Sequence, residues 1–222
     1  MKVIITGATG MVGEGVLHEC LNHPKINNIL IINRSKSHIK HSKLKEIIHT
    51  DFSDFTAIQD QLNGYDAAFL CMGVSSIGMN EEKYKFLTYD LTMALAKPLS
   101  KKNPNLTLIY VSGLGTDSSE KGRLMWARIK GKTENDLMKM PFKNTFAFRP
   151  GGITPTDGLK NTYTILKVIK PILPLLKLLL PNMICSLREV GLAMINASIY
   201  GYNKNIIEVE DIVKLSLKNS NE

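Results

Sequence analysis

The chain has 222 residues, 44% of them hydrophobic, and a formal net charge of +8. This length suits one α/β domain with a full core and leaves little room for a second domain. The three cysteines, Cys20, Cys71 and Cys185, show no metal-ligand spacing, so we expect free thiols and no metal site. Sparse cysteines and a start without a signal or transit pattern predict a reducing, cytoplasmic location.

The positive charge is spread along the chain. Lysines are scattered among Asn and Ile, and the longest basic run is Lys101–Lys102. We interpret this pattern as a solvated, lysine-rich surface and expect no nucleic-acid binding. The excess of positive charge also favours binding of small anionic molecules, such as a phosphorylated cofactor.

Strand and helix patterns alternate as far as Gly152. Short β-branched or apolar runs predict strands, and amphipathic stretches predict helices. Pro98 is expected to kink or split the second predicted helix. The alternation predicts a single doubly wound Rossmann domain over residues 1–222, with a mainly parallel sheet and helices on both faces. The predicted strands are 2–6, 29–33, 45–50, 65–73, 105–113 and 144–152, and the predicted helices are about 11–22, 80–102 and 123–139.

The pattern changes after Gly152. The segment 160–184 is strongly apolar, yet prolines and lysines interrupt it, and no window of about 18 residues is free of charge. We expect helical packing over the sheet or a dimer contact, with peripheral membrane or protein binding through this segment as the alternative. Residues 186–200 have helical period, and 206–218 predict a short strand and a helix. The region 153–205 is therefore expected to be a helical substrate or interaction region, in a monomer or a homodimer.

A glycine-rich turn, TGATGMVG, follows the first strand and opens the first helix. Gly7 allows a tight turn, Gly10 lets a pyrophosphate approach the main chain, and Gly13 lets the helix pack closely on the strand. The helix N-terminus offers free N–H groups and a partial positive charge to phosphates. This context predicts dinucleotide binding. The expected contacts in the loop are Gly7, Thr9, Gly10, Met11, Val12 and Gly13.

The second strand ends in Asn33, Arg34 and Ser35. An acidic residue at this position would bind the ribose 2′-hydroxyl of NAD, and none is present. Arg34 is suited to a 2′-phosphate, with Ser35 beside it. The sequence therefore predicts NADP as the cofactor, in preference to NAD.

Taken together, these motifs resemble the atypical short-chain dehydrogenase/reductases, nearest to the small epimerase-like and Tat-interacting-protein-like members. The resemblance covers most of the chain. It rests on TGATGMVG, on Asp51–Phe52, on CMG at 71–73, on YVSGLGT, on GKTENDL after Lys130, and on FRPGGI near residue 150. It implies an NAD(P)-binding oxidoreductase that acts on a small carbonyl substrate.

The resemblance also implies roles for residues outside the glycine loop. Ser112, at the end of the fifth strand, would polarise the substrate carbonyl, and Lys130 would hydrogen-bond the nicotinamide ribose. Asp51 and Phe52 would contact the adenine. The residues implied beside the adenine ribose and the bridging phosphates are Cys71, Met72 and Gly73, and those bordering the nicotinamide are Pro150, Gly151 and Ile153.

The tyrosine that active members carry four residues before the lysine is replaced by Trp126. The indole N–H only donates hydrogen bonds and is not a practical acid, so Trp126 is left to stack or to line a pocket. Two tyrosines after residue 152 have the same spacing to a lysine but fall beyond the catalytic helix, and two more lie on the predicted helix 80–102. These four are Tyr163, Tyr200, Tyr84 and Tyr89.

Two hypotheses remain open. The first is an NADP-dependent oxidoreductase with Ser112 and Lys130 in the site, where a water molecule or Asp117 completes the proton path. The second is a non-catalytic or regulatory NADP-binding protein that acts through a protein partner or a membrane surface. The identity of the substrate is not readable from the residues.

Overall fold

A single parallel sheet forms the centre of the computed structural model, which describes residues 1–156, 159, 180 and 182–218. Within these residues the sheet has seven strands in the order β3-β2-β1-β4-β5-β6-β9, and each neighbouring pair is parallel. The predicted α/β class and parallel sheet are confirmed. The strands are β1 (Lys2–Thr6), β2 (Asn28–Asn33), β3 (Leu44–Ile48), β4 (Ala67–Leu70), β5 (Thr107–Val111), β6 (Asn144–Phe148) and β9 (Ile206–Ile207).

The order of the strands reverses at β1. The chain moves outward from β1 to β2 and β3, then returns to β4 on the other side of β1. Thr6, the last residue of β1, pairs with Ile32 of β2 and with Leu70 of β4. The carboxyl ends of these three strands therefore meet at one edge, where open α/β sheets bind their ligands.

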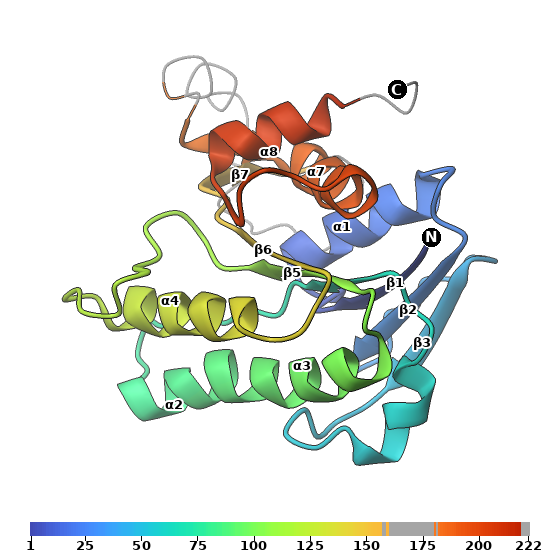
Figure 1. Cartoon of the computed structure of the whole chain (residues 1–222), viewed down its shortest axis with the longest axis horizontal. Helices are drawn as coiled ribbons and strands as arrows, with labels where there is room; N and C mark the ends of the chain where they lie inside the picture. Colours follow the sequence, from blue (N-terminus) through green and yellow to red (C-terminus); the bar gives the residue numbers. More distant parts are fainter. Residues whose placement is uncertain (157–158, 160–179, 181, 219–222) are drawn as a thin grey trace.

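Helices cover both faces of the sheet, as Figure 1 shows. One face carries α1 (Met11–Asn22), α7 (Leu187–Tyr200) and α8 (Val209–Ser216). The opposite face carries η1 (Thr56–Leu62), α2 (Glu81–Lys85), the π-helical turn η2 (Phe86–Asp90), α3 (Leu91–Lys102) and α4 (Met125–Met138). This three-layer arrangement is the doubly wound architecture predicted from the alternating pattern.

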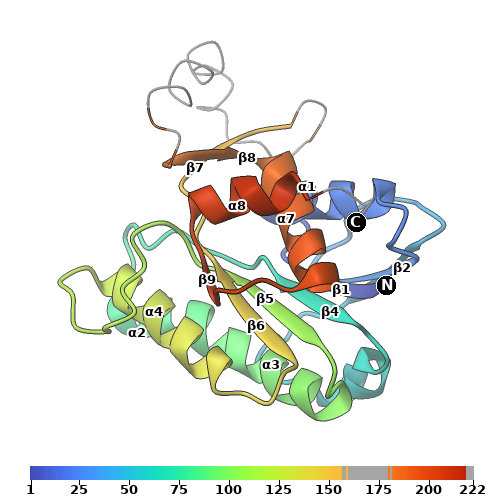
Figure 2. The ribbon, with the colours of Figure 1, turned by 45° about the horizontal axis from the view of Figure 1, so that its top comes forward.

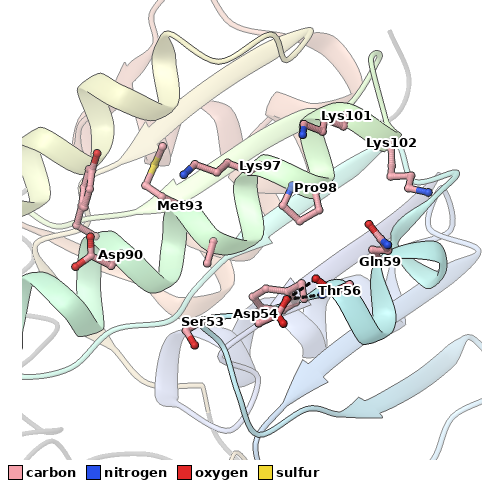
Figure 3. Close-up of a pocket in the computed structure, with 13 residues that line it drawn as sticks. Ser53, Asp54, Thr56, Gln59, Asp90, Met93, Lys97, Pro98, Lys101 and Lys102 are labelled. Carbon is pink, nitrogen blue, oxygen red and sulfur yellow. Dashed lines mark hydrogen bonds between the residues drawn. The ribbon is translucent and has the colours of Figure 1, made fainter.

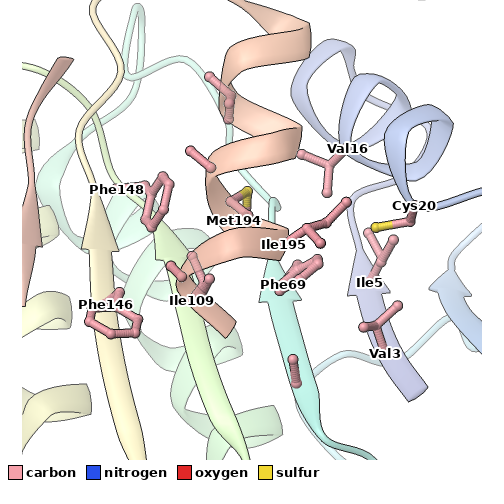
Figure 4. Packing of buried hydrophobic residues seen from close by; sticks show 14 of the residues in the cluster. Val3, Ile5, Val16, Cys20, Phe69, Ile109, Phe146, Phe148, Met194 and Ile195 are labelled. Atoms are coloured by element: carbon pink, nitrogen blue, oxygen red, sulfur yellow. The ribbon is translucent and has the colours of Figure 1, made fainter. Parts of the chain in front are cut away.

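Alternation along each strand divides the core into two clusters, one on each face. Val3 and Ile5 of β1 face α1 and α7, whereas Ile4 between them faces the cluster under α3. Figure 4 shows Val16 and Cys20 of α1 and Met194 and Ile195 of α7 packed over Ile5 and Phe69. Strands that are buried on both sides read as continuous apolar runs, which is why KVIIT and NILIIN are so hydrophobic.

The long helix predicted over 80–102 is interrupted, but the split that was predicted as one outcome at Pro98 does not occur. The irregularity is the π turn η2, and Pro98 lies inside α3. Proline removes one backbone hydrogen bond. The helix continues past it because Leu95, Ala96 and Leu99 are fully buried against the sheet.

The region after Gly152 contains strands as well as the predicted helix. β7 (Gly152–Thr154) pairs in parallel with β8 (Ile184–Ser186) in a small second sheet (Figure 2). Helix α7 follows at once, and its N-terminus carries a capping box between Ser186 and Glu189. Most of the segment 160–184 lies outside the described residues. No helix in the described part is long and apolar enough to cross a membrane.

Candidate functional site

Two adjoining hollows lie along the carboxyl edge of the sheet. Both are lined by Gly10, Cys71, Met72, Gly73 and Val74, so they form one continuous groove, which we call the switch-point groove. The first part extends to the end of β2, and the second part extends to the ends of β5 and β6. Fourteen of the predicted cofactor residues line the groove, as does Ser112; the fourteen are Gly7, Thr9, Gly10, Met11, Val12, Asn33, Arg34, Phe52, Cys71, Met72, Gly73, Lys130, Pro150 and Ile153.

The glycine turn is packed tightly on one side and open on the other. Gly7 has a φ of +74°, and a Cβ on it would lie 2.6 Å from the carbonyl oxygen of Cys71. A Cβ on Gly13 would overlap the carbonyl oxygen of Gly7, so α1 approaches the turn as closely as predicted. Gly10 is the N-cap of α1, and no side chain caps the helix there. The first N–H groups of α1 therefore remain available to an anion, which fits a diphosphate.

The end of β2 provides both a buried acceptor and an exposed cation. The Asn33 Nδ2 donates to Glu46 Oε1 at 2.9 Å, while the buried Asn33 Oδ1 has no partner among the described residues. An unpaired buried acceptor beside a groove fits a ligand that carries hydroxyl groups. Arg34 is exposed on the same part of the groove, and Phe52 forms an apolar wall.

Ser35 and Asp51 do not line the groove in this structure. Ser35 lines a neighbouring hollow together with Thr9, Lys36 and Ser37. The exposed Asp51 carboxylate instead accepts a hydrogen bond from Ser53 N at 2.9 Å, which closes a turn after β3.

Ser112 and Lys130 meet where β5 ends. The Lys130 Nζ donates to the carbonyl oxygen of Ser112, and the Ser112 hydroxyl donates to Glu134 Oε1. Burial lowers the pKa of Lys130, and the nearby Glu134 carboxylate partly opposes this shift. Because the Ser112 hydroxyl donates its hydrogen bond to Glu134, it offers no donor to the groove in this arrangement.

A buried ion pair between Glu134 and Arg149 holds the Ser112 side chain in place. Arg149 Nε donates to Glu134 Oε1 at 3.0 Å, and the same guanidinium donates to Ser118 Oγ at 2.6 Å and to Glu208 Oε1 at 3.2 Å. Burial alone would lower the pKa of Arg149, but its bonds to Glu134 raise it above the ordinary value. This ion pair was not predicted from the sequence. Its only local signal is that Glu134 stands one helical turn after Lys130.

Trp126 and Gly151 lie outside the lining of the groove. The Trp126 ring stands over Gly115, with Cη2 3.4 Å from the position of a Cβ there. Gly151 lies against the carbonyl oxygen of Met183, where no Cβ fits. It therefore allows β7 and β8 to approach closely and does not form part of the groove surface.

None of the tyrosines considered for proton transfer lines the groove in the described part of the chain. Tyr84 is buried, Tyr89 donates to Asp136 at 2.9 Å, and Tyr200 accepts from Lys25 at 2.8 Å. Tyr163 lies outside the described residues. Asp117 accepts from Gly122 N at 2.7 Å and stabilises the loop before α4.

A further hollow lies between η1 and α3 and shares no residue with the groove (Figure 3). Lysines 97, 101 and 102 of α3 surround it, together with Asp54 and Asp90. Lys102 is paired with Asp60 at 2.8 Å. The charges around this hollow are of both signs, so we do not assign a ligand to it.

A doubly wound parallel sheet with a glycine-rich turn at its switch point defines a dinucleotide-binding Rossmann protein. The sequence model of the NAD dependent epimerase/dehydratase family matches residues 3–116, and the chain belongs to that family. This agrees with the predicted resemblance to atypical short-chain dehydrogenase/reductases.

The chain is similar to other proteins at low sequence identity. "Protein FMP52, mitochondrial" of Candida albicans is 27% identical over 170 residues, covering 73% of each chain, and the Emericella nidulans protein fmp52 is 28% identical over 157 residues, covering 68% of this chain and 66% of the relative. Among solved structures, a UDP-N-acetylglucosamine 4-epimerase from Methanobrevibacter ruminantium superposes with a TM-score of 0.67 at 17% identity, covering 93% of this chain and 75% of that one. Bordetella bronchiseptica WbmF in complex with NAD+ gives 0.66 at 13% identity, covering 97% and 76%.

The cytoplasmic location predicted from the sequence is contradicted by these relatives, whose names describe them as mitochondrial. The physical reason is that free cysteines indicate a reducing environment and do not single out one compartment.

Proposed function

We propose that this protein is an NADP-dependent oxidoreductase of a small carbonyl substrate that works without the usual tyrosine. The observation that carries the proposal is the groove itself. It joins an uncapped helix N-terminus behind Gly10, an unpaired acceptor at Asn33 and a buried lysine, Lys130, along one edge of the sheet. These groups match, in order, a diphosphate, a ribose and a reacting centre.

The preference for NADP is supported by the residues after β2. Arg34 lines the groove where an acidic side chain would otherwise favour an unphosphorylated ribose. The neighbouring hollow adds Ser35, Lys36 and Ser37, whose hydroxyls and ammonium suit a phosphate. The competing choice is NAD, which the description of the family names.

Each group of residues has a distinct task in the proposed reaction. A bound nicotinamide dinucleotide supplies the hydride. The glycine turn binds the diphosphate. Lys130 donates a hydrogen bond to the carbonyl oxygen of Ser112 at the end of β5 and faces the groove. Glu134 and Arg149 hold Ser112 and, through it, position the lysine.

Calorimetry with NADPH and NADH tests the cofactor. We expect NADPH to bind more tightly, and Arg34→Ala to weaken it by about ten- to a hundredfold, the effect of losing a charge-assisted contact. NADH affinity should change little. Arg188→Ala, which removes an exposed arginine on α7, is the matched control. Equal NADPH affinity in wild type and Arg34→Ala would show that the 2′-phosphate assignment is wrong.

Turnover is measured with NADPH and a panel of aldehydes, ketones and quinones, followed by loss of absorbance of the reduced cofactor. Tight binding without any turnover would favour the second hypothesis, a regulatory NADP-binding protein. The loss of the tyrosine acid is the observation that keeps this alternative open, because a missing general acid typically costs about 10²–10⁴ in rate.

A further inference from the structure

The proposed reaction needs a proton, and the groove offers few sources of one. The part of the groove at the ends of β5 and β6 is lined by two residues with titratable side chains, Cys71 and Lys130, among those that the structure describes. Burial raises the pKa of Cys71 to about 12, so this thiol is far from a good acid or base at neutral pH. An efficient general acid has a pKa near the working pH.

Other candidate donors are engaged elsewhere. The Ser112 hydroxyl donates to Glu134, and Glu134 is held as an ion pair by Arg149. Tyr89 donates to Asp136 of α4, and the Trp126 indole is not an acid.

Lys130 has the geometry of a donor. Its ammonium group carries three N–H bonds, and the structure assigns one of them to the carbonyl oxygen of Ser112. Gly113 has no side chain, and a Cβ there would lie 3.7 Å from Nζ, so the space beside the ammonium is open. Pro150 and Ile153 form the apolar wall around it.

The charges around Lys130 also suit this task. Burial lowers its pKa, and Glu134 on the same helix opposes that shift. Arg149, at the end of β6, neutralises Glu134, and Cys71, at the end of β4, stays uncharged at neutral pH. An unpaired carboxylate beside Lys130 would raise its pKa and hold it in the charged form. No such carboxylate is present among these neighbours, so the ammonium can release its proton.

We propose that Lys130 is itself the proton donor of this site, in place of the missing tyrosine. The inference rests on the proposed function. As the carbonyl carbon accepts the hydride, the C=O π bond breaks, and the oxygen takes a proton from the Lys130 ammonium. A C–H and an O–H bond form, the cofactor is oxidised, and the neutral amine regains a proton from water. In the reverse direction the neutral amine removes the proton from the alcohol.

The first test does not need turnover. In the apoprotein labelled with ¹⁵N-lysine, the side chain of Lys130 is titrated by NMR, with Lys132 as the control two residues along the same helix. A hydrogen bond to Asp136 raises the pKa of Lys132. We expect Lys130 to lose its proton at a clearly lower pH than Lys132. If both lysines lost their protons at the same pH, the inference would be overturned.

The second test distinguishes the role of Lys130 as a proton donor from its role as a positive charge. Lys130→Arg keeps a cation but has no proton to release near neutral pH. With NADPH and 4-nitrobenzaldehyde, cyclohexanone or menadione, we expect kcat to fall by about a hundredfold or more. The Kd for NADPH should stay within about threefold by calorimetry, because the charge is retained. Lys132→Arg should leave both quantities unchanged.

The pH profile completes the test. Reduction by the wild type should be fastest below the NMR pKa of Lys130 and should decline above it, since the protonated form is the donor. A wild-type rate in Lys130→Arg overturns this inference alone. A protein that binds NADPH but reduces no carbonyl of the panel also counts against the proposed oxidoreductase and favours the regulatory alternative. A wild-type protein that binds neither cofactor overturns the proposed function as well.

Discussion

Gly13 lies against the carbonyl oxygen of Gly7, in a contact so close that a Cβ on Gly13 would overlap it. Gly10, between them, is different: a Cβ there would lie 3.4 Å from the same oxygen, and it lines the groove. One glycine therefore packs the first helix against the turn, while the other leaves room for a ligand.

These two glycines should separate stability from binding. We expect Gly13→Ala to lower the free energy of unfolding by about 1–3 kcal/mol, the usual cost of overpacking. Gly10→Ala should leave thermal stability nearly unchanged and weaken cofactor binding. Urea denaturation and calorimetry on both variants check this. Equal losses of stability in the two would contradict the distinction.

Removing the charge of Glu134 should destabilise the whole domain. Its side chain is fully buried between Ser112 and Arg149, so Glu134→Gln removes the buried counterion of the guanidinium and leaves only the partly exposed Glu208 carboxylate. Breaking such a pair costs about 3–5 kcal/mol. In urea denaturation, the double variant Glu134→Gln/Arg149→Met should recover part of this loss. A single variant as stable as the wild type would mean that the pair contributes little.

Asp136 should give the protein a stability component that disappears in acid. Its carboxylate, 19% exposed, accepts hydrogen bonds from Lys132, Lys139 and Tyr89, and these bonds lower its pKa well below the ordinary value. A lowered carboxyl pKa stabilises the fold above the unfolded value of about 4 and ceases to do so as the pH falls through the folded value.

The matching variant is Asp136→Asn. Because both lysines are largely solvated, we expect a loss of only about 1 kcal/mol near neutral pH. The difference from wild type should begin to shrink below about pH 4, where the carboxyl becomes protonated in the unfolded state, and should vanish only below the lowered folded pKa. Urea denaturation at several pH values measures it. A gap that widened in acid would contradict the direction of the pKa shift.

Trp126 should matter far less to turnover than Lys130. Its ring stands over Gly115 and does not line the groove. We expect Trp126→Phe to change kcat by less than about threefold, compared with about a hundredfold for Lys130→Arg. Steady-state kinetics of the two variants provide the comparison. A large loss in Trp126→Phe would place the indole at the substrate.

Local pattern determined most of the architecture. The apolar runs at 2–6 and 29–33, the helical period at 11–22 and the glycine turn between them could be read directly, because element type depends on neighbours within a few residues. The same holds for Arg34, whose place after a strand follows from the alternation alone. Pro98 misled the prediction, since burial of its helix outweighs one lost hydrogen bond.

Only the tertiary structure decided which side chains meet. Ser112, Glu134 and Arg149 come from β5, α4 and the end of β6, and nothing in their local sequence indicates that they form one buried network. Such contacts depend on how the elements pack across the sheet, at separations of 15 and 22 residues along the chain. Packing likewise directs Trp126 towards Gly115 and leaves the Lys130 ammonium at the groove, and the spacing of these two residues along the chain does not specify either position.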